Sequence, residues 1–269
     1  MPIPVFYVNT FTDQKHKGNP ATVCLLYSDI STGEMQALAK ELAVPVTAFI
    51  RLGDTPVTAT PLRYFTTVTE IPACGHGTLA SAAVMLKLSD NTKTAFQTTE
   101  GVVIDVKSTG DVIVLTYPKY NLTGMAVPEN IVQSLNLQQY VSAGYCAELE
   151  TLFIELDNPS LLRSIQPDFG LMTKSNDGII EVVITSVSDD SKYDFLLRSF
   201  CPWIGIDEDP VTGSVHSILA EFWKQRLGRN KLRAYQASNR GGEAYVTAFD
   251  DKVELGGKTL TVDIKEMTL

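Results

Sequence analysis

Two short segments of the sequence each place side chains that can transfer protons next to a glycine. Cys74 and His76 flank the glycine of the first segment, and Asp209 and Ser214 lie on either side of the glycine of the second. A thiol at a helix N-terminus has a lowered pKa, and a carboxylate enclosed in a dry cleft has a raised one. Either group can then act as an acid or a base near neutral pH.

The glycine of each segment follows a proline and is expected to begin a helix. Residues 70–82 align without gaps with residues 208–220, and this match favours a duplication into two similar domains. The first N–H groups of a helix have no partner inside the helix and attract anions, so two facing helix starts would hold a carboxylate or an oxyanion. The alternative is coincidence between small-residue segments, with Cys74 as a buried hydrophobe and Ser214 as a helix cap.

The elements that must position these segments follow a similar order in both halves. Alternating apolar residues and turn residues predict strands, and the capping box Ser31–Glu34 predicts a helix over 32–43. The other expected elements are strands over 3–9, 21–26, 46–51, 57–65, 94–99, 102–107, 112–117, 140–147, 151–156, 179–186 and 193–200, helices over 75–88, 159–165 and 213–226, and a hairpin turn at Gly256-Gly257. We expect domains over 1–118 and 119–269, with the last strand able to return to the first domain.

The composition indicates a globular protein that binds neither nucleic acid nor membranes. The 269 residues are 44% hydrophobic, the net charge is −9, and Lys and Arg are scattered instead of forming a stripe. The apolar run 79–88 is too short to span a bilayer, and the N-terminus has no secretory pattern, so a cytoplasmic location is expected. The four cysteines and three histidines are dispersed, which predicts neither a disulfide framework nor a metal site, and His216 is expected to be a packing or surface residue.

Five motifs spread over nearly the whole chain resemble the landmarks of one family, the PhzF-like (phenazine biosynthesis-like) isomerases. They are Gly18-Asn-Pro-Ala21, Tyr64-Phe-Thr66, Glu70-Ile-Pro-Ala-Cys-Gly-His76, Glu208-Asp-Pro-Val-Thr-Gly-Ser214 and Gln236-Ala-Ser-Asn-Arg-Gly-Gly242. The resemblance implies an α+β fold of the diaminopimelate-epimerase type. In that fold two similar domains, each a barrel-like, mostly antiparallel sheet around a central helix, enclose the site between them. It also implies cofactor-independent proton transfer on a small carboxylic acid, and a homodimer.

The resemblance also implies roles for individual residues. His76 matches the family's substrate-contacting histidine, and Asp209 and Ser214 match the acidic and hydroxyl residues opposite it. With Cys74 as a further member, His76 and Asp209 form the expected proton relay. The expected substrate-binding residues are Asn19, Gly75, Gly77, Thr78, Gly213, Ser214 and Gly242, and no metal or cofactor is expected.

One position departs from the family pattern. Where the family has Ser-Glu-Thr, with the Glu as the shuttling base, this chain has Pro45-Val46-Thr47, and valine cannot take a proton. Three interpretations remain open: an isomerase using the relay described above, a catalytically silent carboxylate-binding protein, and a one-thiol racemase in which Cys74 faces Asp209. A symmetric two-thiol racemase is disfavoured because the second segment has no cysteine.

Overall fold

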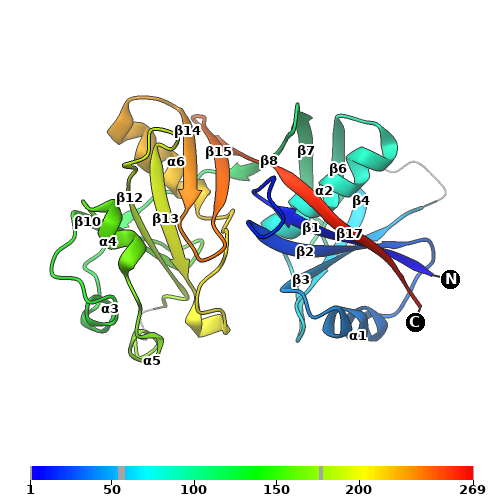
Figure 1. Ribbon diagram of the computed structural model, residues 1–269, viewed down its shortest axis with the longest axis horizontal. Helices are drawn as coiled ribbons and strands as arrows, with labels where there is room; N and C mark the ends of the chain where they lie inside the picture. The colour runs from blue at the N-terminus through cyan, green and yellow to red at the C-terminus, as the bar shows by residue number, and fades with distance from the viewer. Residues whose placement is uncertain (1, 54–57, 176–177, 269) are drawn as a thin grey trace. The chain divides into compact units, whose positions relative to one another are not determined.

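The computed structural model of the chain describes residues 2–53, 58–175 and 178–268. Its contacts divide the chain into unit 1, which is Met1–Thr116 with Leu255–Leu269, and unit 2, which is Tyr117–Glu254. The chain ends in unit 1 because β17 (Thr259–Met267) pairs antiparallel with β1 (Ile3–Thr10). Figure 1 shows the red β17 running beside the blue β1.

Unit 1 consists of a mixed sheet and two long helices. The strands that follow β1 are β2 (Asn19–Leu26), β3 (Val46–Arg51), β4 (Thr60–Phe65), β5 (Glu70–Ile71), β6 (Lys93–Gln97), β7 (Val103–Thr109) and β8 (Val112–Pro118). The helices are α1 (Thr32–Leu42) and α2 (Gly75–Ser89). Helix α1 begins at the predicted capping box, where Ser31 Oγ accepts from Glu34 N and the Glu34 carboxylate accepts from Ser31 N.

Unit 2 contains a second mixed sheet, one long helix and several short ones. Its strands are β9 (Thr123–Gly124), β10 (Ser142–Cys146), β11 (Thr151–Glu155), β12 (Glu181–Val187), β13 (Phe195–Phe200), β14 (Lys231–Gln236) and β15 (Gly242–Ala248), and β16 (Lys252–Gly257) leads back to unit 1. Its helices are α3 (Glu129–Ser134), α4 (Pro159–Ser164), α5 (Phe169–Met172), the 3₁₀ turn η1 (Pro202–Ile204) and α6 (His216–Leu227).

The two units share one order of strand pairing. In unit 1 the pairs β1–β2, β2–β3, β3–β4, β4–β6 and β6–β7 are antiparallel, parallel, antiparallel, parallel and antiparallel. In unit 2 the pairs β10–β11, β11–β12, β12–β13, β13–β14 and β14–β15 repeat that order. The long helix α2 or α6 lies between the fourth and fifth of these strands in each unit. Residues at corresponding register positions can therefore be compared between the units.

Each unit wraps its sheet around one central helix. Six successive residues of α2, 77–82, are buried, as are five successive residues of α6, 216–220. A helix that is buried on successive positions is covered on all its faces. Helix α2 packs against β1, β2 and β3, and α6 packs against β14 and β15. The expected α+β fold, with a barrel-like sheet around a central helix, is therefore confirmed.

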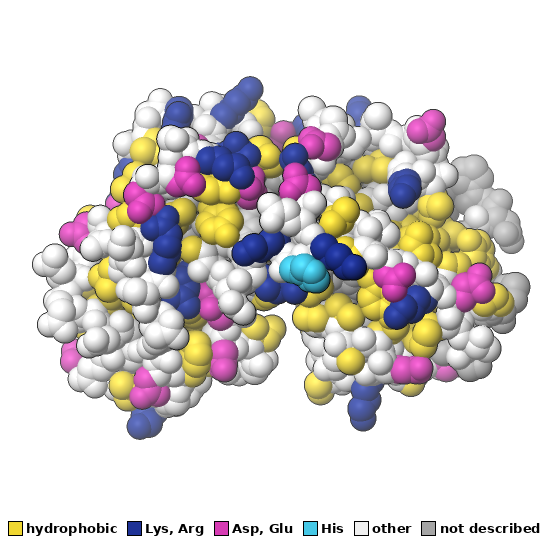
Figure 2. All heavy atoms as spheres, viewed as in Figure 1, with side chains coloured by type: hydrophobic (Ala, Val, Ile, Leu, Met, Phe, Trp, Pro, Cys, Tyr) yellow, Lys and Arg dark blue, Asp and Glu magenta, His cyan; other side chains and the backbone are white. Residues whose placement is uncertain are grey.

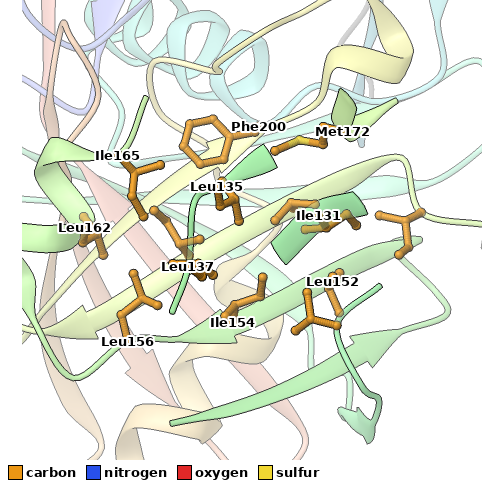
Figure 3. Close-up of a cluster of buried hydrophobic side chains, with 14 of the residues drawn as sticks. Ile131, Leu135, Leu137, Leu152, Ile154, Leu156, Leu162, Ile165, Met172 and Phe200 are labelled. Atoms are coloured by element: carbon orange, nitrogen blue, oxygen red, sulfur yellow. The ribbon is translucent and has the colours of Figure 1, made fainter. Parts of the chain in front are cut away.

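The second face of each sheet carries a separate apolar core. In unit 2, alternate residues of β11 and β12, such as Leu152, Ile154 and Ile184, pack with Ile131 of α3 and Leu162 of α4 (Figure 3). In unit 1, residues of β2, β3 and β4 pack against α1 in the same manner. Because side chains alternate along a strand, the remaining residues of β11, β12 and β13 face α6.

Two local expectations are wrong. Helix α6 begins at His216 and not at residue 213, because residues 213–215 form a turn in which the N–H groups of His216 and Ser217 bond to carbonyls three residues earlier. Gly256 and Gly257 are the last residues of β16 and not a hairpin turn. A Cβ on Gly257 would lie 2.7 Å from a ring carbon of Phe11, so this glycine permits close packing. The beginning of the expected strand 57–65, at Val57, lies outside the described residues.

Among the residues described, no helix combines the length and apolar character needed to cross a membrane. On the face drawn in Figure 2, Lys and Arg side chains are interspersed with Asp and Glu side chains.

Candidate active site

An Arg–Glu ion pair precedes the central helix in each unit. In unit 1 the Arg63 guanidinium makes two hydrogen bonds of 2.7 Å to the Glu70 carboxylate. In unit 2 Arg198 bonds the Glu208 carboxylate in the same way, at 2.7 and 3.1 Å. Such a fork holds two planar groups in one orientation. Each pair therefore ties the segment that leads to the central helix to the strand before it.

The start of α2 positions a thiol and an imidazole. Cys74 is the N-cap, with φ −155°, and its Sγ accepts from Gly77 N at 3.3 Å. The same sulfur lies 3.4 Å from Nδ1 and 3.7 Å from Nε2 of His76. Both side chains are partly buried. A thiolate is stabilised by an amide donor, by a helix N-terminus and by an imidazolium, so this geometry suits proton exchange between sulfur and ring nitrogen.

Two buried hydroxyls support this helix start. Thr78 Oγ1 donates to the Cys74 carbonyl at 2.8 Å and lies 2.6 Å from the Tyr64 hydroxyl. A Cβ on Gly77 would lie 3.1 Å from the Tyr64 ring and 3.2 Å from the Cys74 sulfur, so a larger residue there would require these neighbours to shift. Cys74, Gly75, His76, Gly77 and Thr78 are consecutive residues at the start of α2, and Thr78 is buried.

Asn19 and Val46 lie on neighbouring strands of unit 1. Asn19 is the fully buried first residue of β2, and its carbonyl accepts from Thr10 Oγ1 at 3.0 Å. Val46 begins β3 opposite Ala21 and is 5% exposed. The position where the resemblance implies a carboxylate is therefore filled by a packed aliphatic side chain.

The Asp209 segment of unit 2 is held by Gln236. Asp209 Oδ2 accepts from Thr212 Oγ1 at 2.6 Å. The side chain of Gln236 donates to the Asp209 carbonyl and accepts from Thr212 N, both at 2.8 Å. Ser238 Oγ donates to the Pro210 carbonyl at 2.6 Å. Because Gln236 is the last residue of β14, the end of this strand fixes the conformation of residues 209–212.

The same contacts bring the turn at Gly241 and Gly242 close to the Asp209 segment. Gly242 is paired with Gln236 across β14 and β15, and Gly241 N donates to Ser238 Oγ at 3.1 Å. Gly241 has φ +66°, a conformation that favours glycine. Gly213 is buried and Ser214 partly exposed in the turn before α6. Gln236 and Ser238 were not expected as supporting residues, although both stand in the motif that ends at Gly242.

Glu181 is a further acidic residue near Asp209 that the sequence did not indicate. It is the first residue of β12 and is partly exposed. Its carboxylate accepts from Thr151 Oγ1 at 2.9 Å and from the Ser199 hydroxyl. Burial, together with the negative charge of Asp209, raises the pKa of Glu181 to about 7, although both hydroxyl bonds lower it. Glu181 can therefore be protonated or ionised near neutral pH.

Two other titratable groups of unit 2 are inert. Burial, with the charges of Glu181 and Asp209, raises the pKa of the Cys201 thiol far above its usual range. His216 is fully buried, so burial lowers its pKa to about 4 and the ring stays neutral, next to Phe195. His216 is therefore a packing residue. Within the described part of the chain, no three His, Cys, Asp or Glu side chains are arranged to hold a metal ion.

Comparisons with known proteins agree over nearly the whole chain. The phenazine biosynthesis-like protein family matches residues 8–264. An uncharacterised isomerase of Halalkalibacterium halodurans is 35% identical, with 100% of both chains covered. The crystal structure of a PhzF-family protein from Enterococcus faecalis superposes with a TM-score of 0.92 at 30% identity, covering 100% of both chains. A probable proline racemase from Agrobacterium radiobacter shares the fold, with a TM-score of 0.62 at 11% identity over 99% of this chain and 93% of that one. The chain therefore belongs to the phenazine biosynthesis-like (PhzF-like) isomerase family.

Proposed function

We propose that the chain is a cofactor-independent isomerase that moves a proton on a small carboxylate-bearing metabolite. One observation carries the proposal. Two units with the same order of strand pairing each place acid–base side chains at the start of the central helix or in the segment before it. These side chains are Cys74 and His76 in unit 1 and Asp209 in unit 2.

The substrate carboxylate is bound in this proposal by backbone amides at the start of α2. An anion at a helix N-terminus gains about 0.3–1 kcal/mol when exposed and more when partly buried. The proposed substrate-binding residues are Asn19, Gly75, Gly77 and Thr78 of unit 1 and Gly213, Ser214 and Gly242 of unit 2.

The reaction breaks a C–H bond next to the carboxylate. The electron pair remains on the substrate as an enolate, and the proton passes to one of the relay groups Asp209, His76 or Cys74. The same proton, or one exchanged with solvent, then forms a new C–H bond. The amide donors at the helix start stabilise the negative oxygen of the enolate, which carries more charge than the bound acid.

Isotope uptake tests this function. The protein is incubated in deuterium oxide with L-proline, L-alanine, L-glutamate and L-lactate as first probes, and label at carbon is followed by NMR. The wild-type protein is expected to label at least one acid that it binds. His76→Gln and Asp209→Asn should slow labelling by about 10²–10⁴-fold, the usual contribution of a general acid or base. Tight binding without labelling would contradict an isomerase.

A catalytically silent carboxylate-binding protein is the first alternative, and the buried Val46 favours it. The strand position that would carry the family's base is packed against its neighbours and cannot exchange a proton. On this alternative Cys74→Ser keeps its affinity for the bound acid, and neither the wild type nor the variant labels it.

A one-thiol racemase is the second alternative, and the contacts of the Cys74 sulfur with His76 and Gly77 favour it. On this alternative Cys74→Ser loses turnover while binding is retained, because serine is a far weaker acid and nucleophile than a thiol. The label would then appear at the carbon that inverts.

Two further properties belong to this proposal. The shared pairing order and the repeated ion pairs Arg63–Glu70 and Arg198–Glu208 support an internal duplication. The resemblance to the family also implies a homodimer, which sedimentation velocity of the full chain would test.

A further inference from the structure

The register of the two sheets assigns Glu181 a counterpart in unit 1. On β4, Phe65 lies opposite Thr47 of β3, and on β13, Phe200 lies opposite Val182 of β12. Both phenylalanines follow the paired arginine by two residues, and each lies beneath its guanidinium, at 5.3 and 4.9 Å. The residue before Thr47 is Val46, and the residue before Val182 is Glu181. These two residues therefore occupy the same position in the two sheets.

The side-chain face of Glu181 is the face of the central helix. On the same strand Thr185, four residues later, accepts from the Trp223 indole of α6 at 3.0 Å, whereas Val182 and Ile184 belong to the apolar core on the opposite face. Because side chains alternate along a strand, Glu181 and Thr185 point to one side. Glu181 is the first residue of β12, and its side chain is partly exposed.

Ser199 connects Glu181 to the Asp209 segment. Its hydroxyl donates to the Glu181 carboxylate, and its carbonyl accepts from Asp209 N at 3.1 Å. Thr151 Oγ1, opposite Glu181 on β11, lies 2.9 Å from the second carboxylate oxygen and 2.8 Å from the Leu149 carbonyl, and these two acceptors share its one proton. One oxygen thus accepts from each neighbouring strand, so the carboxylate is fixed while each oxygen keeps a second lone pair.

We propose that Glu181 is a further acid–base residue of the site in unit 2, and that it exchanges the migrating proton with the substrate bound beside Asp209. This inference rests on the proposed isomerase function. The Glu181 carboxylate takes a proton from the carbon next to the substrate carboxylate, the C–H electron pair stays on the substrate as an enolate, and the resulting carboxylic acid returns the proton to carbon. Glu181 ends as a carboxylate again.

The titration of Glu181 suits this role. The titratable groups that face it are Asp209, from the segment before α6, and Cys201, which follows β13. Asp209 opposes ionisation of Glu181, and the two hydroxyls favour it, so both forms are populated around pH 7. A base that must be ionised to act gives a rate that rises with pH through its pKa.

The test follows deuterium uptake by the four acids named above in the full-length wild-type protein and in Glu181→Gln, Glu181→Asp and Glu155→Gln. Glu155 is the matched control, because it is a buried carboxylate of the same unit on the neighbouring strand β11, held by Arg226 at 2.7 Å. Glu181→Gln should lower the exchange rate by about 10²–10⁴-fold with little change in KM. Glu181→Asp should recover part of the rate, and Glu155→Gln should exchange like the wild type.

The pH dependence of the exchange rate distinguishes a catalytic role of Glu181 from a merely structural one. The wild-type rate should rise through a pKa of about 7, and Glu181→Gln should lack this limb. A Glu181→Gln variant that exchanges at the wild-type rate with the same limb would overturn the role of Glu181, while a loss of exchange in Asp209→Asn would still support the proposed function.

A measurement without ligand distinguishes a failure of the proposed isomerase function from a failure of the role assigned to Glu181. The carboxyl-carbon NMR signal that disappears in Glu181→Gln should titrate near 7, and at lower pH in Asp209→Asn, because the neighbouring negative charge has been removed. If no acid is labelled by the wild type, the proposed function fails for these probes, and this titration still supports Glu181 as an acid–base group. A signal that titrates at an ordinary carboxyl pKa in both proteins would overturn the inference.

Discussion

Replacing Glu181 by glutamine should make unit 2 more stable at alkaline pH and leave its stability unchanged in acid. In the folded protein the pKa of Glu181 is raised from 4.5 to about 7, first by burial and then by the charge of Asp209. The folded state therefore binds the proton more tightly than the unfolded state does. The stability associated with this group is fully present below pH 4.5 and is lost as the pH rises through about 7.

The size of the effect follows from the two pKa values. One unit of pKa corresponds to about 1.4 kcal/mol, so a shift from 4.5 to about 7 corresponds to about 3 kcal/mol. Glutamine carries no charge, its amide oxygen can accept from one of the hydroxyls of Thr151 and Ser199, and its NH2 group can donate to the other. The free energy of unfolding of Glu181→Gln should therefore exceed that of the wild type by up to about 3 kcal/mol at pH ~8 and equal it at pH ~4.

The assay can report unit 2 alone, because both tryptophans, Trp203 and Trp223, lie in that unit. Urea unfolding followed by tryptophan fluorescence gives the free energy of unfolding at each pH. Glu155→Gln is the control with the opposite sign. Burial raises the pKa of Glu155, but hydrogen bonds from Arg226 and Ser142 and the Arg226 charge lower it overall. This control should lose stability at neutral pH and approach the wild type as the pH falls.

One result would refute this reasoning. The difference in free energy of unfolding between Glu181→Gln and the wild type should grow from acid to alkaline pH. If it does not grow, the ionised form of Glu181 is not destabilised by its surroundings. Its proposed ionisation near neutral pH would then be wrong.

Three other variants test the supporting contacts. Gln236→Ala should destabilise unit 2 by about 1–3 kcal/mol in urea, because Thr212 N loses its buried acceptor, and it should slow deuterium exchange by releasing the Asp209 segment; unchanged exchange would show that this clamp is dispensable. Arg198→Met should cost about 3–5 kcal/mol in thermal unfolding followed by circular dichroism, against about 1 kcal/mol for Arg63→Met, because their side chains are 7% and 26% exposed; equal losses would contradict the role of burial. Gly257→Ala should cost about 1–3 kcal/mol through overlap with the core, whereas Gly124→Ala, with open space around it, should cost less than about 0.5 kcal/mol in the same assay.

The elements that carry local signals could be predicted from the sequence. The capping box at Ser31 fixed the start of α1, and the Cys74-Gly75 step marked the start of α2 within one residue. The start of α6 could not be found in this way. Its N-cap is Val215, which has no side-chain oxygen, and the alignment with residues 70–82 carried the start of α2 over to a segment that forms a turn.

Glu181 could not be found from the sequence because nothing local marks it. The sequence predicted the strand over 179–186 correctly, but a glutamate at the start of a strand is usually solvated. Its hydrogen-bond donors are Thr151 and Ser199, which are 30 and 18 residues away along the chain. Long-range partners of this kind become visible only with strand pairing. The cluster around Cys74 was accessible because all its members except Tyr64 lie within five consecutive residues.

The surroundings of positions 46 and 181 explain why a carboxylate is present at one position and absent from the other. A carboxyl at position 181 has a hydroxyl donor on each neighbouring strand, whereas position 46 has Ala21 on β2, and the residue of β4 that corresponds to Ser199 is Tyr64, whose hydroxyl already contacts Thr78. A carboxylate buried without donors is costly, so this local environment suits valine at position 46 and glutamate at position 181. Val46 alone is therefore weak support for a silent binding protein. A fold that repeats its strand register can carry the acid–base group at this position in either unit, and the exchange rate of Glu181→Gln decides whether this chain does so.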